Sequence, residues 1–124
     1  MSLFLAATLG LAPLAAQAAA PVGPPAQAPS LSQENSALLR CSAAFALVSY
    51  GQANGDEAAR KWPAIDPRGR EFFVRTLAKL MDDTGMDRDR VSALASAEAQ
   101  RLLDQGQVDA VMPACLLMLE TSGV

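Results

Sequence analysis

Apolar residues after residue 32 recur at every third or fourth position, and no stretch of the chain shows sustained alternation of apolar and polar residues. The clearest stripe lies near the end of the sequence and consists of Val108, Val111, Met112, Cys115, Leu116 and Leu119. Residues at this spacing share one face of a helix, whereas a half-buried strand requires a period of two. The sequence therefore predicts an all-α fold, a small bundle of four or five short helices.

Capping residues, glycines and prolines divide this helical region into segments. We expect helices at residues 32–52, 67–84 and 87–106, and a short helical turn at residues 56–62. Asp66 is expected to cap the helix that follows it, because Pro67 suits the first helical position, and Gly85 is expected to end that helix in the left-handed conformation. The face of this helix that is expected to be buried consists of Phe73, Leu77, Leu80 and Met81.

Pro113 interrupts the last apolar stripe. Proline has no amide hydrogen, and its ring collides with the preceding helical turn. We therefore expect the last helix to start near residue 112 or 113, after a short turn at residues 107–111. A single helix that kinks at Pro113 is the alternative.

The first 20 residues carry no charged side chain and change from an apolar segment to small residues. This pattern predicts a signal peptide at residues 1–18 with cleavage after Ala18, and hence a periplasmic or secreted protein. An uncleaved membrane anchor is the alternative, but Gly10 and Pro13 interrupt a segment that is already short for a bilayer. Four prolines lie between residues 21 and 30, so residues 19–31 are expected to form a disordered linker before a helical domain at residues 32–121.

Both cysteines of the chain lie on apolar helix faces that are expected to point inward, Cys41 in the first helix and Cys115 in the last. In an oxidising compartment such a pair most simply forms one structural disulfide. The loop-entropy model assigns a bridge of this span roughly 4 kcal/mol of stabilisation. A reactive or intermolecular thiol, or two free buried thiols, are the alternatives, but the C-x-x-C spacing of redox pairs is absent.

The sequence contains no histidine, and its 10 basic and 13 acidic residues give a formal charge of −3. The usual general base and the serine-type triads are therefore missing, and no catalytic residue or cofactor is expected. The basic residues form no cluster of the kind that binds a phosphate backbone, so we do not expect a nucleic-acid partner. We also expect no stable membrane insertion after signal cleavage.

Two groups of residues suggest metals, but each has a simpler explanation. Asp82, Asp83, Asp87 and Asp89 surround Gly85, but they lack the ligand order of a calcium loop, and helix capping accounts for them. Soft thioether ligands for copper are offered by Met81, Met86, Met112 and Met118, whose positions follow the expected core. We therefore predict no metal site.

Glu98 and Trp62 are the remaining candidate site residues. Glu98 falls along the edge of an apolar helix face, where a half-buried carboxylate can bind a ligand or sense pH. Alternatively, its helix is rotated slightly and Glu98 pairs with Arg101 in solvent. Trp62 is either a contact for a protein partner or, more simply, a cover for one end of the core.

The blocks "LLRCSAAFALVSYGQ", "GREFFVRTLAKLMDDTG" and "VMPACLLMLE" resemble small exported two-cysteine helical proteins of Gram-negative bacteria. This resemblance covers about residues 36–120 and implies an exported protein, but that uncharacterised group brings no assigned activity and no catalytic residue. In general layout the chain is also similar to periplasmic acid-stress chaperones.

From these features we expect a non-enzymatic protein that interacts with a protein partner, as a stress-related or chaperone-like factor does. The alternative is a carrier of a small ligand or a metal, with an apolar pocket between the helices and Glu98 or a methionine as its polar contact.

Overall fold

The computed structural model describes residues 31–124, which form five helices and, over that range, no strand. The helices are α1 (Gln33–Ala53), α2 (Glu57–Arg60), α3 (Arg68–Thr84), α4 (Arg88–Asp104) and α5 (Val108–Thr121). The predicted all-α fold is therefore confirmed. The predicted signal peptide and all but the last residue of the predicted linker lie outside the described residues.

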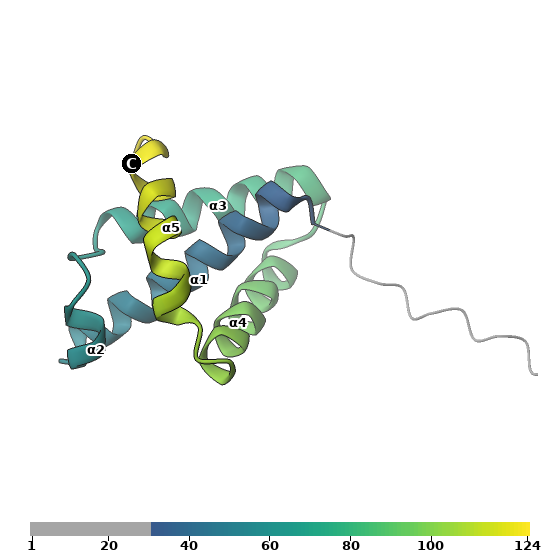
Figure 1. The fold of residues 1–124 in the computed structure, drawn as a ribbon. Helices are drawn as coiled ribbons and strands as arrows, with labels where there is room; N and C mark the ends of the chain where they lie inside the picture. Colours follow the sequence, from purple (N-terminus) through teal and green to yellow (C-terminus); the bar gives the residue numbers. More distant parts are fainter. Residues whose placement is uncertain (1–30) are drawn as a thin grey trace, which may run out of the picture.

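Helix α1 is the central element, and it packs against each of the other four helices. Figure 1 shows α5 crossing α1, α2 at the C-terminal end of α1, and α4 diverging from α5. Ser32 caps α1 by accepting a hydrogen bond from the amide of Asn35 at 3.0 Å. Five consecutive residues, 41–45, are buried, which shows that the middle of α1 is enclosed on all sides.

The buried residues form two clusters around α1. The larger cluster joins all five helices and centres on Phe45 and Phe72, whose rings meet edge to face with centroids 5.2 Å apart. The smaller cluster lies where α1, α3 and α4 meet, and consists of Leu39, Leu80, Met86, Val91 and Ala95. Small residues in α1, such as Ala43 and Ala44, allow the neighbouring helices to approach closely.

Most predicted helix ends are confirmed. Gly85 ends α3 with a φ of 72°, and the Asp87 carboxylate caps α4 by accepting a hydrogen bond from the amide of Arg90. The predicted cap at Asp66 is wrong, because α3 begins at Arg68 and has no side-chain cap. Its first turn is closed instead by the amide of Gly69, which donates to the carbonyl of Ile65, while the Asp66 carboxylate lies 3.7 Å from Arg70.

The predicted start of the last helix is also wrong, because α5 begins at Val108 and continues through Pro113. Met112 and Cys115 are buried on either side of the proline, whereas Pro113 itself is exposed. Burial of a methionine side chain stabilises the fold by about 2 kcal/mol. A proline inside a helix costs about 3 kcal/mol, because a hydrogen bond is lost and the ring crowds the preceding turn, but Met112, Cys115 and Leu119 of the stripe are all buried and together outweigh this cost.

The predicted face of α3 is shifted by one position. Phe72, Thr76 and Leu80 are buried against the rest of the molecule, whereas Phe73 and Leu77 are only partly buried. Phe73 and Leu77 nevertheless pack against the smaller core cluster. The polar Thr76 inside the buried face is the reason why the apolar pattern alone misplaces it.

Candidate functional site

Cys41 of α1 and Cys115 of α5 form a disulfide with their Cα atoms 5.1 Å apart, as predicted. Both residues are buried, and no cysteine is left as a free thiol. Such bridges persist mainly outside the reducing cytosol, so this one fits a non-cytoplasmic protein. Its position also fixes α5 against the central helix.

A surface groove of about 520 Å³ lies between the C-terminal half of α1, α2 with the segment after it, the end of α4 and the start of α5. The residues that line this apolar groove are Leu47, Val48, Tyr50, Gly51, Asn54, Asp56, Ala58, Ala59, Trp62, Leu102, Leu103, Gly106, Val108 and Asp109. Most of them are apolar. A groove of this size and lining is typical of binding sites in proteins.

Two of the large apolar side chains that line the groove are exposed to solvent, Tyr50 at 71% and Leu103 at 54%. Large apolar side chains exposed at a concave apolar surface are a common feature of interaction sites. Among the described residues, Val74 and Leu117 are the other exposed large apolar side chains, and neither lines the groove.

Trp62 forms part of the groove wall and is half-buried against the larger core cluster. Its Nε1 donates a hydrogen bond to Oδ1 of Asp109 at 3.1 Å, and the Lys61 ammonium lies 5.4 Å from the centroid of its ring. Hydrogen bonds from Lys61 and Trp62 hold the pKa of Asp109 below its ordinary value. Trp62 therefore covers one end of the core and also faces the groove, so the two interpretations of this residue are compatible.

Gln52 fixes the segment that carries Trp62, a role that the sequence did not suggest. Its side-chain amide donates to the carbonyls of Ala59, Trp62 and Pro63, and its side-chain oxygen accepts from the amide of Ile65. The short helix α2 and the loop after it are thereby held against the end of α1. A glutamine at the end of a helix carries no signal of such long-range contacts.

Glu98 lies in a second depression of about 400 Å³. This charged hollow is lined by Leu31, Ser36, Leu39, Arg40, Glu98, Arg101, Gln107 and Val111. The Glu98 side chain is only 17% exposed, and it accepts two hydrogen bonds from Arg101, one of them from Nε at 2.9 Å. These hydrogen bonds raise the pKa of the Arg101 guanidinium above its ordinary value.

Nε of Arg40 lies 3.7 Å from the same carboxylate. Glu98 is thus largely buried and is also paired with Arg101, as the second alternative expected, while its role in ligand binding or pH sensing stays a prediction. Sequence reasoning missed Arg40, because nothing in the spacing of residues shows that α1 and α4 bring it beside Glu98. Glu98 does not line the apolar groove, so the predicted combination of Glu98 with an apolar pocket is not formed.

Several of the residues considered as metal ligands have other roles. Asp83 pairs with Lys79 and accepts a hydrogen bond from Asn35, and Asp87 caps α4. The four methionines are divided between the two core clusters. Within residues 31–124, no three histidine, cysteine or acidic side chains are grouped so that they could hold a metal ion. In the same range, no helix has the length and apolar character needed to cross a membrane.

No family model matches the chain, no curated protein matches its sequence, and no solved structure matches its fold.

Proposed function

We propose that this chain is a non-enzymatic binding protein of the periplasm or the secreted fraction, and that its apolar groove takes up an apolar segment of another polypeptide. A chaperone-like or stress-related role is the most specific form of this proposal. The observation that carries it is the groove itself, whose mostly apolar lining includes the exposed side chains of Tyr50 and Leu103.

The charges in the groove favour one type of segment. Asp56 and Asp109 are the charged side chains among its lining residues, and both are acidic; Lys61 pairs with Asp109, whereas Asp56 forms no ion pair within the described residues. Complementary charge favours the correct partner and suppresses others. The preferred segment therefore carries basic residues beside its apolar ones.

Trp62 provides a direct test, because it is the only tryptophan of the chain and lines the groove. Its fluorescence is recorded while an amphipathic peptide of leucine and lysine is added, and then with a peptide in which glutamate replaces lysine. We expect a saturable change in emission with the lysine peptide and a much weaker one with the glutamate peptide. No change with either peptide would remove the proposal.

Two exposed leucines give a matched pair of variants. Leu103 lines the groove and is 54% exposed, whereas Leu117 lies outside the groove on α5 and is 71% exposed. We expect L103E to weaken binding of the lysine peptide by at least about tenfold, the size expected for loss of an apolar contact residue. L117E is expected to bind as the unchanged protein does. Equal effects of the two substitutions would show that binding does not involve the groove.

The chaperone-like form of the proposal has its own readout. Light scattering of an aggregating client protein is measured from acidic to neutral pH with the unchanged protein, L103E and L117E. We expect suppression of aggregation by the unchanged protein and by L117E, and a loss of suppression with L103E. Native mass spectrometry of the exported protein tests the alternative role, because a carrier of small ligands is expected to retain a bound molecule.

A further inference from the structure

The charged hollow lies where α1, α4 and the start of α5 meet, next to the apolar groove along the chain but with a different set of lining residues. Helices α4 and α5 both pack on α1, and the disulfide also links α5 to α1. The two helices diverge from the turn at residues 105–107 (Figure 1). Helix α1 contributes Arg40, α4 contributes Glu98 and Arg101, and α5 contributes Val111. The hollow and the groove share no lining residue, so the two sites can be tested separately.

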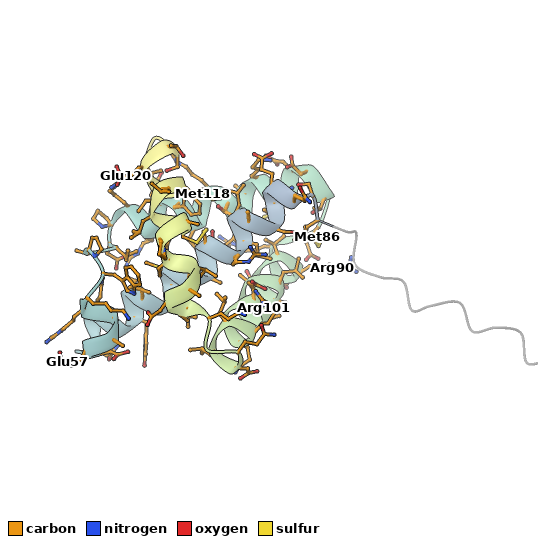
Figure 2. All side chains as sticks on the ribbon, in the orientation of Figure 1. Glu57, Met86, Arg90, Arg101, Met118 and Glu120 are labelled. Atoms are coloured by element: carbon orange, nitrogen blue, oxygen red, sulfur yellow. A yellow bond between two sulfur atoms is a disulfide. The ribbon has the colours of Figure 1, made fainter. Side chains whose placement is uncertain are left out.

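The charges that line the hollow do not cancel. Arg40 and Arg101 contribute two positive charges, and Glu98 contributes one negative charge, which leaves +2 − 1 = +1. Arg101 projects from the C-terminal half of α4 (Figure 2). A partly enclosed site with one uncompensated positive charge attracts a monoanion. A dianion is less suitable, because Glu98 lies within the same site.

The two arginines differ in how their donors are used. Arg101 donates from Nε and Nη2 to Glu98 and from Nη1 to Gln105. The guanidinium of Arg40 makes no hydrogen bond within the described part of the chain, and its contact with Glu98 is an ion pair through Nε at 3.7 Å. Its side chain is 45% exposed, so both of its Nη groups can donate to a ligand in the hollow. Two such groups match the two oxygens of a carboxylate.

The remaining walls of the hollow determine what the carboxylate is attached to. Leu31, Leu39 and Val111 supply apolar surface, and Ser36 and Gln107 supply neutral polar groups. The geometry points to a binding site for an organic monocarboxylate, with the carboxylate on the guanidinium of Arg40 and a short apolar stem against Leu39 and Val111. This ligand class includes free organic acids and the C-terminal carboxylate of a polypeptide.

The test uses hexanoate and N-acetyl-leucine as carboxylate probes, and hexanamide and N-acetyl-leucine amide as their neutral counterparts. Binding to the intact oxidised protein is followed by the NMR signal of the Arg40 Nε–H group. We expect saturable shifts with the carboxylates and none with the amides. Tighter binding of hexanoate indicates a free acid, and tighter binding of N-acetyl-leucine indicates a polypeptide terminus. Failure of both carboxylates to bind, or equal binding of the amides, would overturn the inference.

Variants identify the arginine that holds the carboxylate. R40Q is expected to weaken binding of the better carboxylate by at least about tenfold, because a charged hydrogen-bonding partner is lost. R90Q is the matched control, since Arg90 lies on α4 outside the hollow (Figure 2). R40K keeps the charge without the paired donors and is expected to bind with intermediate affinity. If R40Q binds the carboxylate as tightly as the parent protein does, Arg40 does not hold it. If R40Q does not fold, the comparison of acids with amides in the parent protein still decides whether the site binds carboxylates.

Discussion

At the scale of single residues, Gly69 is the described glycine at which an added side chain would have the least space. It is buried in the first turns of α3, where a Cβ atom would lie 2.2 Å from Cγ2 of Ile65 and 3.4 Å from Cβ of Phe45. The neighbouring atoms include a core side chain that cannot move freely. The segment before α3 can therefore lie close to α1 only because Gly69 has no side chain.

We predict that G69A lowers the free energy of unfolding by about 1–3 kcal/mol, the range for overpacked cores. At a helix position with free space, replacement of glycine by alanine raises the free energy of unfolding by up to about 1 kcal/mol through helix propensity. The change predicted for G69A therefore has the opposite sign. Urea denaturation measures the change. V74A, at an exposed position of the same helix, is the control and is expected to change stability by less than about 1 kcal/mol. A G69A protein at least as stable as the parent would contradict the prediction.

At the scale of the helices, α1 and α3 are joined by a polar contact beside the smaller core cluster. Asn35 is buried, and its side-chain amide donates to Asp83 at 3.0 Å, while Lys79 donates to Asn35 and to Asp83. Hydrogen bonds from Lys79 and Asn35 lower the pKa of Asp83 below its ordinary value of 3.8. The charged form of Asp83 therefore stabilises the folded state.

The sign of this effect sets the pH dependence. A carboxylate with a lowered folded-state pKa stabilises the fold above the unfolded-state pKa, and the stabilisation is lost as the pH falls through the folded-state pKa. We predict that D83N lowers the midpoint of thermal unfolding at neutral pH. The difference from the unchanged protein should shrink below pH 3.8 and vanish once Asp83 is also protonated in the folded state.

D82N is the matched control for this experiment, because the exposed Asp82 precedes Asp83 and takes part in none of the ion pairs formed within residues 31–124. Calorimetry over a range of pH values measures both variants. The D82N midpoint is expected to follow that of the unchanged protein at each pH. A D83N difference that stayed constant on acidification would show that the carboxylate acts through packing and not through its charge.

The helices also show which features the sequence carries and which it does not. Local signals such as Gly85 and Asp87 placed helix ends correctly, because the physics of capping involves only neighbouring residues. Pro113 misled the same reasoning, since burial of Met112 against distant helices decided the outcome. The buried face of α3 is shifted toward Phe72 for a similar reason, because Phe72 packs against Phe45 of α1.

The candidate sites were less predictable than the helices. Glu98, Arg101 and Trp62 stood out in the sequence, but their surroundings come from other helices. Arg40 lies 58 positions before Glu98 in the sequence, counted as 98 − 40, and only the packing of α4 on α1 brings the two together. The apolar groove likewise combines four segments, and none of them shows it alone.

At the scale of the whole molecule, the disulfide is the one covalent link between the central helix and the last helix. It joins residues separated by 74 positions, so it restricts most of the described chain in the unfolded state. Helix α5 also supplies Val108 and Asp109 to the apolar groove and Val111 to the charged hollow. Stability and both candidate sites therefore depend on the same bridge.

We predict that the double variant C41A/C115A loses about 4 kcal/mol of unfolding free energy, because the unfolded chain regains the entropy of an open loop. Domains of this kind have total stabilities of about 5–15 kcal/mol, so the variant should be marginally folded at ambient temperature. Urea denaturation monitored by circular dichroism measures the loss, and the unchanged protein in reductant is the comparison. Because α5 forms one wall of the groove, Trp62 emission should change at a lower urea concentration in the variant, together with the loss of helix. A variant with the same urea midpoint as the oxidised protein would show that packing alone holds α5 in place.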